Sequence, residues 1–321
     1  MLQQKEISNL QKDEPINHYF LIKKIETKVN KNEKEYLLFE LGDHSGSIIG
    51  FKWTNISEFH KQLEPGEIVK IKGKTLDYNG QIQISIDNIY KPSENENIPI
   101  SYFLPRCDKD IEDLKIKFWK RIDNIKDDNL KKLLKVFFTP EVFEKFCLAP
   151  AGKSWHHAYI GGLLEHVIEM IRLADLICDL HKEINRDLLI AGCVLHDVGK
   201  IDELFYDRNF DYTDEGKLNG HILIGISLLN KAINKLDNFP QELERQLIHL
   251  IASHQGRLEY GSPIEPKTLE AIALHGIDEL SSKVNAYKSA IKQDLNSGSK
   301  WTRYQTLINS MIYIPDNFGK N

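Results

Sequence analysis

Histidines and aspartates in the second half of the chain stand where a helical pattern calls for apolar residues. His166 lies within the spacing of Leu163 and Met170, and Asp278 continues the spacing of Leu274. A polar side chain turned toward a core is costly unless a partner satisfies it. The residues with this placement are His166, His196, Asp197, His254 and Asp278. A divalent cation satisfies several imidazole and carboxylate groups at once, so the pattern predicts a metal centre.

Each of these residues has a simpler interpretation when it is taken alone. A single inward histidine is more often a hydrogen-bonded core residue than a ligand, and a buried aspartate is usually a helix cap or an ion-pair partner. Convergence of four predicted helices favours the metal, and zinc, manganese, iron and cobalt suit these ligand types.

The adjacent pair His196-Asp197 indicates what kind of scaffold must surround it. Neighbouring residues on a helix diverge by about 100°, so both side chains reach one centre only if other helices close around it. The chain after residue 105 reads as amphipathic helices, and from residue 150 onward as helices and loops only. Thr139-Pro140 marks one helix start, with a capping side chain before a proline. We therefore predict an all-α domain around the centre.

A different pattern occupies residues 15 to 95. Val, Ile, Tyr and Phe alternate with polar residues in short runs, and an Asn79-Gly80 turn separates two of them. About five such runs fit a small Greek-key barrel, for which the oligonucleotide-binding (OB) fold is the leading candidate. Residues 91–105 have three prolines and no period, so they read as a linker.

The predicted barrel carries side chains that could bind a single strand of nucleic acid. Phe51 and Trp53 alternate onto one face of their strand, and Lys70, Lys72 and Lys74 onto one face of another. Single-strand binding needs aromatic platforms and a basic track of this kind. Barrel core is the alternative for the aromatic residues, and a solvated face for the lysines. Because the formal net charge is −5, any contact with nucleic acid must come from local patches.

The remaining composition favours a cytoplasmic protein without a membrane segment. No apolar run approaches the roughly 20 residues that span a bilayer, and the first residues lack the apolar core of a secretion signal. The cysteines form no CxxC pair, which argues against a disulfide framework and a thiolate zinc site. They are Cys107, Cys147, Cys178 and Cys193. The sequence leaves the oligomeric state open, a homo-oligomer being one outcome.

The histidine and aspartate pattern resembles the H…HD…D signature of the HD phosphohydrolase superfamily. His166, the pair His196-Asp197 30 residues later, and Asp278 match its positions. The extended form HDVGK at 196–200 is typical of the phosphodiesterase branches of this superfamily.

The resemblance implies a role for each matched residue. The first metal would be bound by His166, His196, Asp197 and Asp278. Asp197 would bridge to a second ion held by His221 and His254. Lys200 would meet the substrate phosphate, so Asp197 and Lys200 are the expected catalytic residues. The expected ion is Mn²⁺, with Co²⁺, Fe²⁺, Zn²⁺ and Mg²⁺ as alternatives and one or two ions bound, and such ions activate water toward a phosphodiester.

The likeness extends over nearly the whole chain. The predicted barrel, connecting helices and segments such as RDLLIAGCVLHDVGK and YTDEGKLNGHILIG resemble the YhaM-type 3′→5′ exoribonucleases. The resemblance implies an OB-fold nucleic-acid-binding domain at 1–95, a linker with connecting helices at 96–140, and an HD domain at 141–321. His156 and His157 would contact the leaving group or the nucleic-acid backbone, with capping or packing as an equal alternative. One departure is Gln255, where the family pattern often has a second histidine.

Three functions compete on this reasoning. The favoured one is a metal-dependent 3′→5′ exoribonuclease that acts on single-stranded RNA, with single-stranded DNA as a further candidate, and releases mononucleotides. The second is an HD hydrolase of nucleotides or cyclic dinucleotides with a regulatory OB domain, because the metal centre would serve any phosphodiester. The third, a nucleic-acid-binding scaffold with a degenerate centre, is disfavoured because all six expected ligand positions are occupied. The OB module and the likeness favour a polymer substrate.

Overall fold

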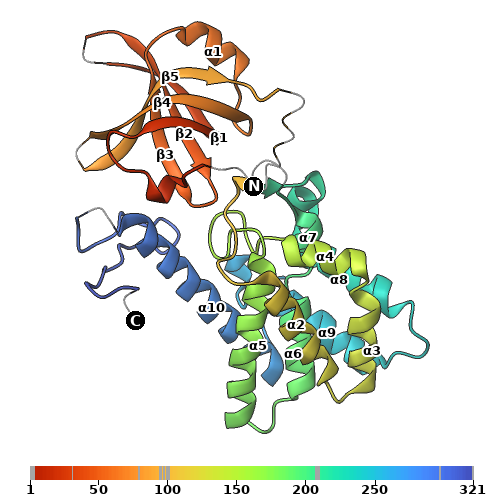
Figure 1. Ribbon diagram of the computed structural model, residues 1–321. Helices are drawn as coiled ribbons and strands as arrows, with labels where there is room; N and C mark the ends of the chain where they lie inside the picture. The colour runs from red at the N-terminus through yellow and green to blue at the C-terminus, as the bar shows by residue number, and fades with distance from the viewer. Residues whose placement is uncertain are drawn as a thin grey trace. The chain divides into compact units, whose positions relative to one another are not determined.

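The computed structural model (Figure 1) describes residues 4–30, 32–78, 80–93, 96, 98, 102–206, 210–295 and 298–319. Contacts divide the chain into two compact units, one ending at Arg106 and the other beginning at Cys107. The predicted order of an N-terminal β-barrel and a helical second part is confirmed. The finer limits at residues 95 and 140 stay a prediction.

The first unit is a closed barrel with the strand order β1-β2-β3-β5-β4. Neighbouring strands are antiparallel except β3 and β5, whose parallel pairing closes the barrel. Its elements are the 3-10 helix η1 (Ile7–Asn9), β1 (Pro15–Val29), β2 (Glu35–Asp43), β3 (Gly46–Lys52), α1 (Ile56–Gln62), β4 (Ile68–Tyr78) and β5 (Gln81–Tyr90). The predicted hairpin is present, since Tyr78 pairs with Gln81, although Asn79 of its turn lies outside the described residues.

Alternation along the strands separates the core of the barrel from its outer face. In β4, Val69 and Ile71 are buried, whereas Lys70 and Lys72 between and after them turn outward. Period two sends successive side chains to opposite faces of a strand. The largest core residues are Phe20, Ile22, Leu37, Phe39, Leu41, Ile71 and Ile84.

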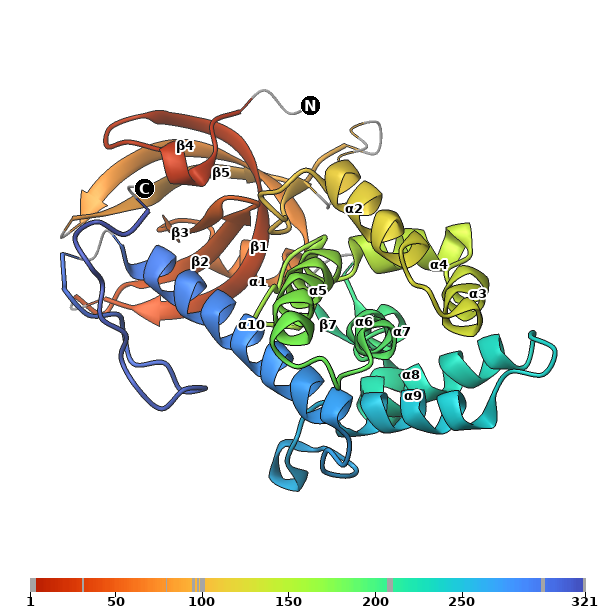
Figure 2. The same cartoon turned by 90° about the horizontal axis from the view of Figure 1, so that it is seen from below.

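The second unit is helical, and Figure 2 shows α5 beside α10. Its helices are α2 (Ile111–Asp123), α3 (Asp128–Phe137), α4 (Pro140–Leu148), α5 (Gly162–Leu180), α6 (Arg186–Leu195), α7 (Lys200–Glu203), α8 (Asp214–Ile233), α9 (Gln241–Ser253), the 3-10 helix η3 (Leu258–Tyr260) and α10 (Leu269–Asp294). One apolar core joins α2 to α10, and each fully buried leucine or isoleucine in it contributes about 1.5–3 kcal/mol. Helix α4 begins as predicted, because the Thr139 hydroxyl accepts from the Val142 N–H and Pro140 follows the cap.

The expectation that only helices and loops follow residue 150 is wrong in two places. Strands β6 (Leu204–Phe205) and β7 (Asp211–Tyr212) form a short antiparallel pair. Bridges at Trp301–Tyr313 and Gln305–Ser310 make a C-terminal ribbon of residues 301–313. Pairs this short leave no periodic signal in a sequence.

The C-terminal ribbon is fixed to the end of α10. The backbone N–H and the Nε of Arg303 donate to the buried carboxylate of Asp294 at 2.6 and 2.9 Å. Ile312 and Ile314 pack in a small core with Ala290 and Ile291 of α10. Among the helices of the described ranges, none combines the length and apolar character that crossing a bilayer needs.

Candidate metal centre

All six predicted metal ligands come from the helical unit, and they gather around one carboxylate. They are His166 on α5, His196 and Asp197 after α6, His221 on α8, His254 after α9, and Asp278 on α10. Helix α6 ends at Leu195, so His196 occupies its C-cap and Asp197 begins a turn. The two adjacent side chains therefore reach the centre from a helix end, where the backbone is free to turn.

One set of ligand atoms lies between α5, α6 and α10. His166, His196 and Asp197 place donor atoms within 4.8 Å of one another. Asp278 completes this set, with Oδ1 at 3.1 Å from His166 Nε2 and 4.0 Å from His196 Nε2. These four donors are the residues predicted to hold the first ion.

A second set shares Asp197 with the first. Asp197, His221 and His254 again place donors within 4.8 Å of one another. Asp197 Oδ1 faces His221 Nε2 at 3.5 Å and His254 Nε2 at 3.6 Å, while Oδ2 faces His196 Nε2 at 3.2 Å. One oxygen of the carboxylate is thus directed to each set, which is the arrangement that a bridging ligand requires.

Two of the histidines are oriented by backbone carbonyls one helical turn earlier. His196 Nδ1 lies 3.0 Å from the Cys193 oxygen, and His254 Nδ1 lies 2.8 Å from the Ile251 oxygen. A proton on Nδ1 in these bonds leaves Nε2 as the atom presented to the centre. Metal-binding histidines are commonly held in this way.

Side chains orient the other two histidines. His166 Nδ1 lies 3.1 Å from the Ser281 hydroxyl. Glu203 Oε1 lies 3.1 Å from His221 Nδ1 and accepts the His221 backbone N–H at 3.0 Å. All four imidazoles therefore direct Nε2 inward.

Two buried atoms of the centre have no hydrogen-bond partner among the described residues. They are His196 Nε2 and Asp197 Oδ1; the 3.2 Å approach of His196 Nε2 to Asp197 Oδ2 lacks hydrogen-bond alignment. A buried polar atom without a partner costs about 1–3 kcal/mol. A cation between the two sets would satisfy both atoms, and imidazole with carboxylate is a donor set that divalent ions accept.

Protonation of the histidines follows from burial and from the carboxylates. Burial lowers the pKa of His254 to about 3, and it also lowers the pKa of His166, so both rings are neutral. Burial opposes protonation of His196 too, but the negative charges of Asp197 and Asp278 outweigh it and raise the pKa of His196. The centre thus favours a positive charge at the position where an ion would lie.

Lys200 is tied to Asp197, the carboxylate that is predicted to bridge two ions. Its Nζ lies 2.5 Å from Asp197 Oδ2 and also donates to the Ala151 carbonyl. Burial alone would raise the pKa of Asp197, but the charges of Lys200 and His196 outweigh it and hold the pKa well below the usual value. Asp197 is therefore ionised, and Lys200 holds its second oxygen in place.

Two glycines shape the backbone around His221. A Cβ on Gly199 would lie 2.0 Å from the His221 carbonyl oxygen, so the HDVG turn packs directly on the backbone of α8. Gly220 has φ 67° and ψ 160° and interrupts α8 immediately before His221. Glycine alone adopts that conformation readily. The kink sets the direction from which His221 enters the centre.

Comparison with known proteins agrees with this architecture. The HD domain family matches residues 163–283, and the family described as OB-fold nucleic acid binding domain matches residues 21–92. The 3′-5′ exoribonuclease YhaM of Bacillus subtilis (strain 168) is 35% identical over 302 residues, which cover 94% of this chain and 95% of that protein. The protein of the same name from Geobacillus sp. (strain WCH70) is 34% identical and covers 94% and 92%.

This chain belongs to the YhaM 3′-5′ exoribonuclease family. The predicted OB and HD assignments are both confirmed. A solved structure, the second OB-fold domain of replication protein A from Methanococcus maripaludis, is similar with a TM-score of 0.24 and 22% identity. The match covers 28% of this chain and 95% of the solved domain.

The position where this YhaM-family chain departs from the expected pattern lies beside His221, a predicted metal ligand. Gln255 Nε2 is 3.4 Å from His221 Nε2, and Gln255 lines the cleft over the centre. Gln255 therefore contacts His221 from the side of the cleft, and its role toward metal or substrate stays a prediction.

The cleft over the metal centre has a volume of about 630 Å³. His156 and Lys200 line it, and the His156 ring lies 5.0 Å from the His166 ring. His157 is buried and does not line the cleft: its Nε2 lies 3.3 Å from Glu169, and its Nδ1 lies 3.4 Å from His156 Nδ1. The roles of His156, His157 and Lys200 toward substrate stay predictions.

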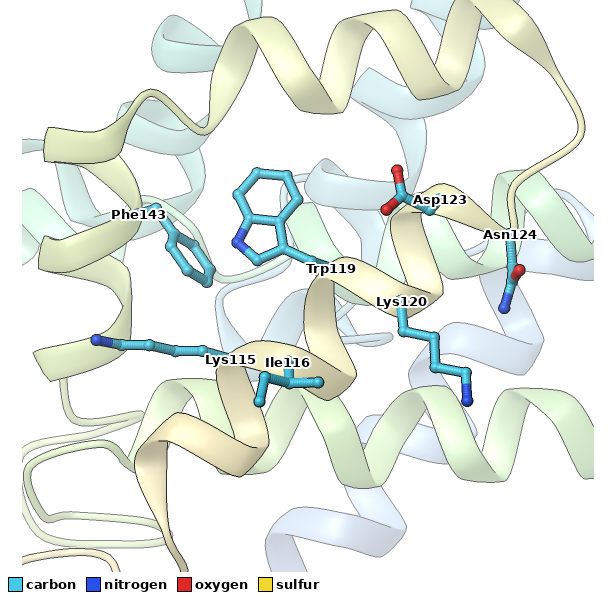
Figure 3. A pocket seen from close by; sticks show the side chains of 7 residues that line it. All are labelled: Lys115, Ile116, Trp119, Lys120, Asp123, Asn124 and Phe143. Atoms are coloured by element: carbon cyan, nitrogen blue, oxygen red, sulfur yellow. The ribbon is translucent and has the colours of Figure 1, made fainter.

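A second hollow, of about 580 Å³, lies over α2 of the same unit (Figure 3). Trp119 and Phe143 lie side by side in it, with ring centroids 4.9 Å apart. Its lining carboxylate, Asp123, is paired with Lys135 at 2.8 Å. Histidine is absent from the residues that line it, so this hollow lacks the converging donors of the metal cleft.

The predicted aromatic residues of the barrel lie on its outer face. Phe51 is half-buried and Trp53 is 48% exposed, so neither belongs to the barrel core. Tyr36 joins them, with ring centroids 5.7 Å from Phe51 and 4.6 Å from Trp53. We call Tyr36, Phe51 and Trp53 the aromatic group.

The three predicted lysines lie on a strand close to the aromatic group. Ser85 of β5 pairs with Phe51 on one side and with Lys74 on the other, so one strand separates the two. Lys70 Nζ lies 4.8 Å from the Tyr19 ring centroid, and Lys72 is held similarly at 5.4 Å by Tyr90. Nucleic-acid binding by these residues stays a prediction.

Several residues that line the cleft or orient its histidines were not predicted from the sequence. Glu203 stands in a helix too short to show a period, and Ser281 lies one turn beyond Asp278 in α10. Tyr260 and Tyr287 line the cleft but gave no pattern that separates them from surface residues. The signal for Ser281 was available, since small polar residues interrupt the inward face of α10 there.

Proposed function

We propose that this protein is a metal-dependent 3′-5′ exoribonuclease that hydrolyses single-stranded RNA and releases mononucleotides. One observation carries the proposal: six imidazole and carboxylate donors, Asp278 among them through its contacts with His166 and His196, form two sets that share Asp197, with two buried donor atoms left without a partner. The chain aligns over 94% of its length with proteins named 3′-5′ exoribonuclease, which supports RNA as the polymer.

The charge and the orientation of these donors suit the binding of cations. Asp197 and Asp278 are ionised, and the four imidazoles present Nε2 because Nδ1 is occupied. Divalent ions in such a site supply Lewis acidity to the phosphodiester and make water a better nucleophile at neutral pH. We propose two ions, one per donor set, and Mn²⁺ as the physiological metal.

The residues around the centre then act on the substrate. Lys200 fixes the carboxylate of Asp197 and adds a positive charge at the edge of the cleft. Burial holds the pKa of His156 well below its usual value, so this ring is neutral and contacts the strand by hydrogen bonding. A neutral hydrogen-bond donor beside two metal ions would suit the bridging or leaving oxygen of a phosphodiester, because it stabilises the negative charge that develops there.

The barrel would bind nucleotides upstream of the cleaved end. Its aromatic group offers faces on which bases stack, and Lys70, Lys72 and Lys74 offer positive charge to phosphates. Single-stranded DNA as a second substrate, a homo-oligomeric assembly and a cytoplasmic location belong to the same proposal.

Product analysis on labelled RNA tests the function. With Mn²⁺ and 5′-labelled single-stranded RNA, we expect a descending ladder and release of mononucleotides, while duplex RNA resists. RNA that stays intact while free nucleotides or cyclic dinucleotides are hydrolysed would replace this proposal with the nucleotide hydrolase.

A further inference from the structure

The metal cleft extends along one face of α10. Asp278, Ser282, Lys283 and Tyr287 all line it, and they follow one another at helical spacing. A helix rises about 1.5 Å per residue, so Tyr287 lies about 14 Å along the axis from Asp278. The cleft therefore extends about 14 Å along α10 beyond the metal centre.

The tip of the C-terminal ribbon lies at the end of this stretch that is far from the metal centre. Leu307, Ile308 and Asn309 line the same cleft. Ile308 also packs in the small core with Ala290 and Ile291, which begin one turn beyond Tyr287. Along α10, the metal centre is followed by Ser282 and Lys283, then by Tyr287, and then by the ribbon tip.

The tip is held in a defined position. Arg303 binds the buried Asp294 at the base of the ribbon. At the tip itself, the Tyr304 hydroxyl donates to Asn309 Oδ1 at 2.5 Å, and Gln305 pairs with Ser310. A ribbon fixed at base and tip can act as a wall.

The two ends of the cleft differ in chemistry. The metal end presents imidazoles and carboxylates, whereas the far end presents apolar and aromatic groups with one amide. There Tyr287 is 40% exposed and Leu307 67% exposed, and Tyr260 of η3, which also lines the cleft, is 57% exposed. A nucleotide has the same polarity, since a charged phosphate is joined to a flat base that stacks on aromatic rings.

We propose that the ribbon tip is the end wall of a subsite for the 3′-terminal nucleoside and thereby confines cleavage to the last phosphodiester. The inference rests on the proposed exoribonuclease function and adds the element that makes the cleft accept a chain end. With the scissile phosphate at the metals, the terminal base stacks on Tyr287, and the strand cannot continue past Leu307. The cleft volume of about 630 Å³ is in the range of about 300–1,000 Å³ that ligand sites usually have.

Replacing residues 306–309 by Asn-Gly tests the wall, because a two-residue turn shortens the tip. Linear RNA, circular RNA of the same sequence and the small diester bis-p-nitrophenyl phosphate are compared, with Mn²⁺, in the full-length protein. The intact protein should degrade linear RNA and leave circular RNA whole. The shortened variant should hydrolyse the small diester at the intact rate, cut circular RNA and release oligonucleotides. Circular RNA that stays whole with mononucleotides as products overturns the proposal.

A pair of matched variants decides the matter should the shortened tip fail to fold. Leu307→Trp adds bulk at an exposed position of the cleft, and Met311→Trp adds it at a 51% exposed position of the same ribbon outside the cleft. Leu307→Trp should lower kcat/KM on RNA and not on the small diester, whereas Met311→Trp should change neither. Equal kcat/KM on RNA for the two variants would overturn the proposal that the ribbon tip is the end wall of the subsite.

Substitution of Tyr287 tests the subsite independently. Tyr287→Ala should lower kcat/KM on RNA by about 5- to 150-fold, the value of one stacked base, whereas Tyr287→Phe keeps the ring and the rate. Unchanged kcat/KM on RNA in Tyr287→Ala would show that the terminal base does not stack on Tyr287. Failure of the function itself has a different signature, because the intact protein would then leave linear RNA whole.

Discussion

The metal cleft and the outer face of the barrel hold their functional side chains in opposite ways. In the cleft, each imidazole is buried or nearly so and has a specific Nδ1 partner, such as Ser281 for His166. On the barrel, Trp53 and Lys72 are exposed and rest on neighbouring rings. A buried donor set has one arrangement that avoids unpaired atoms, whereas an exposed face tolerates many. Single substitutions should therefore be decisive in the cleft and graded on the barrel.

The largest effect is expected at the ligand that both donor sets share. Asp197→Asn should lower hydrolysis of bis-p-nitrophenyl phosphate by about a thousandfold or more, because ion-derived charge stabilisation is worth several kcal/mol. Bound metal, measured by elemental analysis of the purified protein, should fall as well. Asp202→Asn, on α7 and outside the cleft lining, is the matched control and should keep both. Full metal content in Asp197→Asn would refute the shared-ligand assignment.

The residues that orient the histidines should have an intermediate effect. Glu203→Ala and Ser281→Ala each remove the partner of one Nδ1, and loss of such a partner typically costs about 10–100-fold in metal affinity. Metal titration should show weakening of one ion's binding in each variant. If both variants bind Mn²⁺ as tightly as the intact protein, these contacts serve packing alone.

The aromatic group should have a smaller effect that only long substrates report. Phe51→Ala and Trp53→Ala should each weaken binding of single-stranded RNA by about 1–3 kcal/mol, with hydrolysis of the small diester unchanged. Fluorescence anisotropy with labelled RNA measures the binding, and absorbance measures the hydrolysis of the small diester. Tyr78→Ala, an exposed aromatic residue of β4 outside the aromatic group, serves as control. If Phe51→Ala and Trp53→Ala bind RNA as tightly as Tyr78→Ala, the aromatic group does not take part in RNA binding.

The lysines should have the smallest effect, and it should depend on salt. Replacing Lys70, Lys72 and Lys74 together by Gln should reduce the slope of log affinity against log salt by up to about 0.7 per contacted phosphate. Binding measured from low to high salt tests this. An unchanged slope would mean that these lysines face solvent only.

The sequence predicted both folds because each has a clear period. Alternation in β4 separates Ile71 from Lys72, and the 3-4 spacing around His166 marks an inward polar residue in α5. Inward placement alone led to the prediction of His166, His196, Asp197, His254 and Asp278 as ligands, while the prediction of His221 required the family resemblance. A half-buried residue after a glycine kink, as His221 is, follows no stripe.

Other features could not be predicted, for physical reasons. Apolar Val198 and Ile201 continue the pattern past Leu195, so the sequence does not reveal that α6 ends there. Glu203 reaches His221 through a turn whose course depends on the contact between Gly199 and α8. The C-terminal ribbon is held by Arg303 and Asp294, a pair that no spacing rule connects.

Degradation of 5′-labelled single-stranded RNA after chelation and metal return tests the central claim most directly. The protein is freed of metal, assayed, supplied with Mn²⁺ and assayed again, beside Asp197→Asn treated in the same way. We predict no degradation without metal, a returning 3′-5′ ladder of mononucleotide steps in the intact protein, and none in the variant. Degradation by the metal-free protein, or a full ladder from Asp197→Asn, would contradict the account.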